Sequence, residues 1–109
     1  MRTLKFIVDG QILKQDPTCD FTGLVPGTEG YIQADFSFSP EWKDCVKVAG
    51  FYSIMGQEYE PRLLTDENTC MIPAEALARR KFKIQVIGRR NSDSKLVSNK
   101  IIIKKSCPK

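Results

Sequence analysis

Hydrophobic and polar residues alternate along much of this chain with a period of two, which is typical of β-strands that bury one face. The clearest case is the segment YIQADFSF at residues 31–38. Its apolar side chains share one face (Ile32, Ala34, Phe36 and Phe38), and Gln33, Asp35 and Ser37 share the other. The pattern predicts a half-buried strand with a fixed inward face, because a slip of one residue would expose the whole apolar set.

Two hairpins are predicted from turn residues between alternating runs. TLKFIV and QILKQ flank the dipeptide Asp9-Gly10, which suits a type I′ turn because glycine readily adopts positive φ. VKVAGFYSIM turns at Gly56-Gln57 and returns as EYEPRLL. Pro61 within the returning run predicts an edge strand or a bulge, since proline cannot donate a hydrogen bond to a neighbouring strand.

A third hairpin is predicted near the C-terminus, where KFKIQVIGRR is joined by NSDS to one final strand, KLVSNKIIIKK. Alternation places Phe82, Ile84 and Val86 inward. The segment DPTCDFTGLVPGTEG is rich in Gly, Pro, Asp and Thr, and therefore predicts a loop. One short strand is expected within that loop, from Phe21 to Val25.

The segment CMIPAEAL is the one place where the chain is expected to be helical. Pro73 suits the first helical position and good helix formers follow it, so a single turn is predicted over about residues 73–78. Leu77 is expected to plug an end of the core. Cys70 shares a strand face with Ile72, which favours a buried structural thiol over a reactive one at a helix start.

These elements predict one all-β domain over residues 1–109. The expected fold is an immunoglobulin-like two-sheet β-sandwich of seven to eight strands with one short helical turn. The Cys…Trp…Cys spacing of antibody domains is not satisfied, because Trp42 precedes a strand in a proline-containing turn. We expect Trp42 to cap an end of the core, the alternative being an exposed anchor for a partner.

The 109 residues include no histidine, which excludes Ser-His-Asp, Cys-His and histidine-ligated metal chemistry within this chain. The cysteines at 19, 45, 70 and 107 lie 26, 25 and 37 residues apart, without the close pairs of a structural zinc site. We therefore expect no catalytic, cofactor-binding or metal-binding residues, and a protein that is not an enzyme.

The start of the chain, MRTLKFIVDG, does not resemble a signal peptide, and no apolar run approaches the roughly 18 residues that span a bilayer. We expect no membrane partner, and we expect the chain to be synthesised in the cytoplasm and to stay there at least at first. In that compartment the cysteines are expected to stay reduced.

Charge is distributed unevenly along the chain. Residues 1–78 hold 6 Lys/Arg against 12 Asp/Glu, a net of −6, whereas residues 79–109 hold 11 against 1, a net of +10; together they give +4. The candidate interaction residues are the basic ones of the last hairpin: Arg79, Arg80, Lys81, Arg89, Arg90, Lys95, Lys104 and Lys105. They indicate either a nucleic-acid surface or a solvated face that lies beside an acidic face of the same molecule or of a neighbouring subunit. Phe82 is predicted to point into the core, so no exposed aromatic is expected to stack on bases, and self-assembly is favoured.

Three sequence elements resemble a small β-sandwich module of tailed bacteriophages and prophages, found among baseplate, tail-fibre and head-fibre accessory proteins. They lie within GYIQADFSFSPEWKDCVKVAGF, LLTDENTCMIPAEAL and FKIQVIGRR…LVSNKIIIKK, over roughly residues 30–104. The matching positions are Phe38, Ser39 and Trp42; Asp66, Cys70, Ile72, Pro73, Glu75 and Leu77; and Val86 and Gly88. Such modules often begin longer proteins with a receptor-binding region, whereas this chain stops with the sandwich, which favours a stand-alone accessory role.

The resemblance implies a non-enzymatic structural protein of the virion that is in the host cytoplasm during assembly. Its expected role is capsid decoration, head fibre or tail and baseplate component, and its partners are other capsid or tail proteins and copies of itself. The alternatives are a cytosolic phage protein that inhibits a host or defence factor, and a nucleic-acid-binding module that uses the basic C-terminal hairpin.

Overall fold

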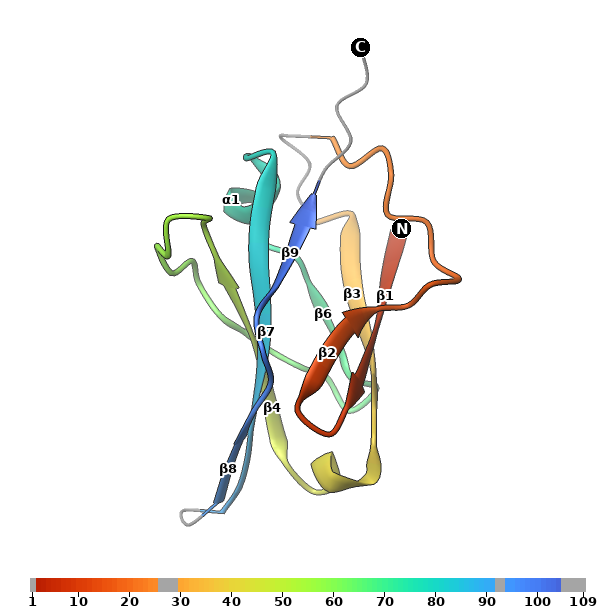
Figure 1. Cartoon of the computed structure of the whole chain (residues 1–109), viewed down its shortest axis with the longest axis vertical. Helices are drawn as coiled ribbons and strands as arrows, with labels where there is room; N and C mark the ends of the chain where they lie inside the picture. Colours follow the sequence, from red (N-terminus) through yellow and green to blue (C-terminus); the bar gives the residue numbers. More distant parts are fainter. Residues whose placement is uncertain (1, 26–29, 92–93, 105–109) are drawn as a thin grey trace.

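A computed structural model describes residues 2–25, 30–91 and 94–104, and in it two β-sheets pack face to face (Figure 1). The elements are β1 (Arg2–Asp9), β2 (Ile12–Gln15), β3 (Ile32–Phe38), the 3₁₀ turn η1 (Pro40–Trp42), β4 (Val46–Tyr52), β5 (Arg62–Leu63), β6 (Thr69–Met71), α1 (Ala74–Leu77), β7 (Lys81–Asn91), β8 (Ser94–Val97) and β9 (Ile101–Lys104). The predicted all-β sandwich is confirmed. The described residues form nine strands rather than seven or eight.

The first sheet has the strand order β2-β1-β3-β6. β1 runs parallel to β3 from the pair Arg2↔Ile32 to the pair Val8↔Phe38 and antiparallel to β2, while β6 runs antiparallel to β3. The inward face of β3 is the predicted one, with three buried side chains followed by Phe38, which is half-buried and packs 5.1 Å from Trp42 between ring centroids.

The β1–β2 hairpin is confirmed, but its turn differs from the type I′ turn predicted. Asp9 pairs with Ile12, so the two turn residues are Gly10 and Gln11. Gly10 has φ of +60°, and Gln11 is not among the described residues with positive φ. A type I′ turn needs positive φ at both turn residues, whereas a type II′ turn has glycine at the first, so the turn is of type II′.

The second sheet has the order β5-β4-β7-β8, and β9 also pairs with β7. Phe82, Ile84 and Val86 are completely buried, as predicted. Pro61 directly precedes β5, a two-residue strand at the edge of the sheet, which confirms the expected edge position.

The predicted last strand is split into β8 and β9 by Ser98, Asn99 and Lys100. Ser98 is buried; its hydroxyl accepts a hydrogen bond from the Val86 amide at 2.9 Å and donates one to the Asn99 carbonyl. Asn99 contacts the β1–β2 hairpin of the other sheet. Its backbone N–H donates to Gln11 O at 3.1 Å, and its side-chain Oδ1 accepts from Leu13 N at 2.6 Å. The break therefore ties the edge strand β2 to the second sheet, and alternation alone gave no sign of it.

No strand forms at residues 21–25, contrary to the prediction. Gly23 has φ of +72°, and Asp20 accepts hydrogen bonds from both the amide and the hydroxyl of Thr22, which favours a turn over an extended strand. The segment still contributes to the core, because Leu24 is buried and the Phe21 ring lies edge-on to Phe6 at 5.4 Å.

Trp42 is completely buried at one end of the sandwich, as the prediction of a core role required. Its indole nitrogen donates a hydrogen bond to Gly10 O at 2.7 Å. Its six-membered ring lies against Gly88 of β7, where a Cβ atom would stand only 2.9 Å from Trp42 Cε3 and Cζ3. Gly88 is therefore required by the close approach of the indole ring.

The helical turn at the other end is confirmed, with a shift of one residue at its start. Pro73 has ψ of 144° and stands outside the helix as its N-cap, so α1 begins at Ala74. Leu77 is buried in the core as predicted.

The arrangement of β3–β6 in one sheet and β5-β4-β7-β8 in the other matches the pairing of strands B with E and of C with F and G in the immunoglobulin fold. The parallel β1–β3 pair departs from the purely antiparallel sheets of that fold.

Candidate interaction surfaces

Cys70 is a core residue and not a nucleophile. It lies in β6 opposite Ala34, and only 7% of it is exposed. Burial raises the pKa of the Cys70 thiol to about 12, so the thiol stays protonated at neutral pH. Cys19 and Cys45 are half-buried free thiols, and Cys107 lies outside the described residues.

The basic residues singled out in the sequence do not form one patch. Arg79 and Arg80 lie at the α1–β7 junction, and at the same end Lys81 pairs with Lys104 across β7 and β9. Arg89 and Lys95 face each other near the other end of β7. Eight residue steps separate Lys81 from Arg89, or about 26 Å along a strand. Lys105 lies outside the described residues.

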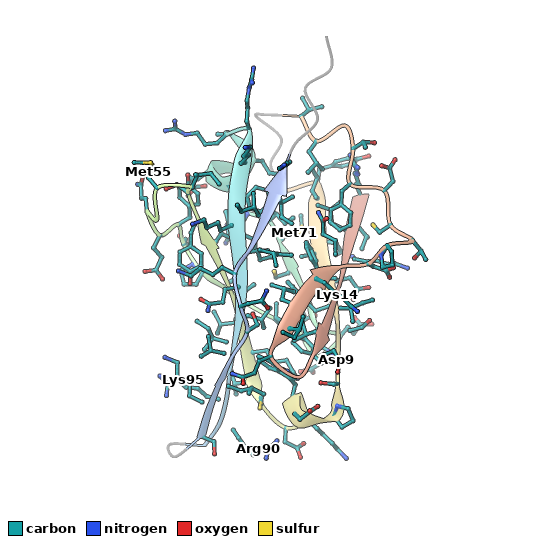
Figure 2. All side chains as sticks on the ribbon, viewed as in Figure 1. Asp9, Lys14, Met55, Met71, Arg90 and Lys95 are labelled. Atoms are coloured by element: carbon teal, nitrogen blue, oxygen red, sulfur yellow. The ribbon has the colours of Figure 1, made fainter. Side chains whose placement is uncertain are left out.

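Arg90 has a structural role. Its guanidinium donates hydrogen bonds to Glu41 O at 2.8 Å and to Lys43 O at 3.3 Å, and so holds the η1 turn against β7. Figure 2 shows Arg90 and Lys95 on opposite sides of the β7–β8 hairpin. The two residues therefore cannot contact the same flat partner surface.

A row of apolar side chains crosses the outer face of the second sheet. The strand register places four of them side by side on β5, β4, β7 and β8: Leu63, Val48, Ile87 and Val97. We call this set the apolar row. Ile87 alternates with the buried Val86 and so points outward. Leu63 is 66% exposed and the other three are half-buried, so the row is an apolar strip open to solvent.

The outer face around the apolar row is basic. The outward positions of β4, β7, β8 and β9 include five basic residues, Lys81, Lys83, Arg89, Lys95 and Lys104, and no carboxylate among the described residues. Tyr52, also outward, is covered by the Lys100 ammonium 4.2 Å from its ring centroid. Glu58 pairs with Tyr52 at one edge of this face. The face thus combines an apolar centre with a rim in which cations outnumber carboxylates.

A cleft of about 320 Å³ opens between the β4–β5 loop and the start of β7. Its lining residues are Ser53, Ile54, Met55, Gln57, Tyr59, Arg79, Arg80 and Lys81. We call it the basic cleft. Met55 is 93% exposed and projects from the left side of the molecule in Figure 2. The one ion pair among the described residues joins Arg62 and Glu60, so Arg79, Arg80 and Lys81 have no carboxylate partner within the described chain.

A hollow of about 500 Å³ lies at the other end of β4. Its lining residues are Asp44 to Lys47, Leu63 to Asp66, and Asn68. We call it the Asp44 hollow. Val46 is 62% exposed beside Leu63, so the hollow has an apolar part that carboxylates border. Its one cation, Lys47, is engaged within the chain, because Nζ donates to Cys45 O at 3.5 Å and lies 5.1 Å from the Phe38 ring centroid.

Residues 2–25, 30–91 and 94–104 contain no group of three or more His, Cys, Asp or Glu that could hold a metal ion. In the same part of the chain, no helix has the length and apolar character needed to cross a membrane.

Comparison with known proteins gives no relative from which a function can be transferred. No family model, no curated protein and no solved structure matches the chain. Any function must therefore be argued from the surfaces described above.

Reasoning from the sequence missed the apolar row. In VKVAGFY, the valines at 46 and 48 face outward while Ala49 and Phe51 are buried, so both faces of this strand carry apolar residues. That two-sided pattern was a usable signal, since an antiparallel strand with one face in water is expected to be polar on that face. The row itself depends on the register of four strands.

Proposed function

We propose that this protein is a non-enzymatic accessory component of a tailed-phage particle, and that it docks onto another particle protein through the outer face of its second sheet. The apolar row is the observation that carries the docking proposal, because exposed contiguous apolar surface with a polar rim is characteristic of protein interfaces. The phage assignment is supported by the sequence resemblance over roughly residues 30–104.

The charges on this face indicate the kind of partner. Face-to-face pairing of two copies would bring five cations of each copy together, since no carboxylate occupies an outward position on β4, β7, β8 or β9. Like charges in an interface are unfavourable. The fitting partner is therefore a different protein surface with an apolar centre and carboxylates around it.

The test is incorporation into particles. Ile87→Glu places a carboxylate in the middle of the apolar row, and the matched control Ile12→Glu makes the same change at a 58% exposed position on the first sheet. Mass spectrometry of purified particles should detect wild-type protein and the Ile12→Glu variant, and should show a loss of at least tenfold for Ile87→Glu. Circular dichroism must show that both variants are folded.

Two outcomes would overturn the proposal: particles that never contain the wild-type protein, or equal incorporation of both variants. If particles lack the protein and a single host protein co-purifies from infected cells in equal amount, the alternative of a host or defence-factor inhibitor is correct instead. Ile87 would then be expected to contact that host protein.

A further inference from the structure

The two ends of β4 carry surfaces of opposite character. The basic cleft lies beyond Tyr52 and the Asp44 hollow lies beside Val46. Six residue steps separate Tyr52 from Val46, or about 20 Å, and the molecule is 47 Å along its longest axis. The two surfaces therefore lie apart and cannot contact each other within one molecule.

The basic cleft presents a projecting apolar side chain together with cations. Met55 is 93% exposed and Ile54 is 40% exposed, and both line the same cleft as Arg79, Arg80 and Lys81. Glu58 is the one carboxylate in residues 53–59, and it does not line the cleft. A flexible thioether side chain such as that of Met55 adapts well to an irregular apolar hollow.

The Asp44 hollow offers the complementary features. Val46 and Leu63 are 62% and 66% exposed within it, and Asp44 and Asp66 are exposed carboxylates at its border. Since Lys47 already contacts Cys45 O and the Phe38 ring, those carboxylates have no side-chain cation bound to them in the described chain.

We propose that copies of this protein assemble head to tail, with Met55 of one copy seated in the Asp44 hollow of the next. Arg79 and Arg80 of the first copy then face Asp44 and Asp66 of the second, and apolar side chains meet between them. Such a contact joins two different surfaces, so it propagates into a ring or a filament rather than closing as a symmetric dimer. The contact shares Leu63 with the apolar row and Lys81 with its basic rim, but it requires no other particle protein.

The composition of the basic cleft favours a protein occupant over nucleic acid. Sites for single-stranded nucleic acid combine cations with exposed aromatic rings on which bases stack. The one aromatic residue that lines the cleft is Tyr59, which is half-buried and packs against the core. The exposed apolar side chains that line the cleft are Ile54 and Met55, and neither is aromatic.

The test is self-association of purified, nuclease-treated protein, measured by sedimentation equilibrium up to about 1 mM, the concentration at which a contact worth roughly 4 kcal/mol is half formed. The mass should rise above the 12.4 kDa of one chain with concentration and fall again at high salt, because salt screens exposed charge pairs. Met55→Ser should weaken association at least tenfold.

Charge exchange identifies the contact. Arg79→Glu/Arg80→Glu makes the basic cleft acidic like the Asp44 hollow, whereas Asp44→Asn/Asp66→Lys removes the carboxylates of the hollow. Asn is used at position 44 because this residue has φ of +65°, which Asn tolerates. Each variant alone should remain monomeric, and an equimolar mixture should associate again, because each supplies the surface that the other lacks. Lys5→Glu/Lys14→Glu, on the first sheet, lowers the net charge by 4, as Arg79→Glu/Arg80→Glu does, and should associate like wild type.

The proposal is overturned if wild-type protein stays monomeric throughout this range, if the mixture does not restore association, or if Ile87→Glu abolishes association while Arg79→Glu/Arg80→Glu does not. Association present only before nuclease treatment would also overturn it, and would assign the basic cleft to nucleic acid. None of these results depends on particle incorporation, so the docking proposal stands or falls separately.

Discussion

Substitution of Gly88 by alanine tests the packing of the end of the sandwich that Trp42 fills. The added methyl group would stand 2.9 Å from two ring carbons of Trp42 and 3.2 Å from Cys45 Cβ. The indole ring is completely buried and its nitrogen donates to Gly10 O at 2.7 Å, so the ring cannot move aside without weakening that hydrogen bond. Backbone strain does not contribute, because Gly88 is not among the glycines with positive φ.

The expected loss of unfolding free energy combines three contributions. Overpacking a core by one methyl group costs roughly 1–3 kcal/mol, and a weakened hydrogen bond costs up to about 1 kcal/mol. Replacing glycine by alanine returns about 0.4–1 kcal/mol by restricting the unfolded chain. The midpoints of these ranges give a net loss of about 2 kcal/mol, which urea denaturation measures directly, or a fall in Tm of about 8 °C at roughly 4 °C per kcal/mol.

A double-mutant cycle with Trp42→Phe separates ring contact from other causes. Phenylalanine is smaller than tryptophan, so the methyl group at position 88 should fit beside it at a cost below about 0.5 kcal/mol, leaving a coupling energy of at least about 1 kcal/mol. Equal costs of Gly88→Ala in both backgrounds, or a Gly88→Ala protein as stable as wild type, would refute the packing argument.

Three further predictions concern other parts of the chain. Native Cys70 should resist thiol reagents at pH 8, because a pKa of about 12 leaves only about one thiolate in 10⁴, while the thiol of unfolded protein should react fully. Cys70→Ser should lower the free energy of unfolding by roughly 1–3 kcal/mol, because the hydroxyl is buried without a partner. Asn99→Ala should cost roughly 0.5–1.5 kcal/mol in urea denaturation, because the partly buried Leu13 amide loses its acceptor. Asn99→Asp keeps an oxygen there and should cost less; equal losses would exclude this role. The pKa of Asp16 should lie below its ordinary value, chiefly because the Thr18 backbone amide and then the Thr18 hydroxyl donate hydrogen bonds to the carboxylate. The ionised Asp16 carboxylate therefore stabilises the fold above about pH 3.9, and this contribution is lost as the pH falls through the folded pKa. An NMR titration that places Asp16 at or above that value would contradict it.

Residue alternation was sufficient to predict which faces of the strands are buried. Phe36, Phe82 and Ile84 were placed correctly because side chains alternate with a period of two in any strand, whatever its partners. The edge position of β5 followed from Pro61 for an equally local reason, the missing amide donor.

The errors arose where a distant residue decides the local structure. The interruption at Ser98 and Asn99 depends in part on hydrogen bonds between Asn99 and Leu13, which lie 86 positions apart in the chain. The segment from Phe21 is irregular yet packs against the core. The type II′ turn likewise follows from the pairing of Asp9 with Ile12, which sets the turn one residue later than the dipeptide suggested.

The sequence by itself determined the fold class, the buried faces and the structural roles of Trp42, Cys70 and Leu77. Only the tertiary structure decided which residues form the candidate interaction surfaces. In the folded chain Lys81 and Arg89 lie near opposite ends of β7, and Arg90 donates a hydrogen bond to the backbone of η1. Ile87 is in register with apolar residues of three other strands. The physical reason is that burial follows from local alternation, whereas a surface patch exists only after strands distant in sequence are paired in one register.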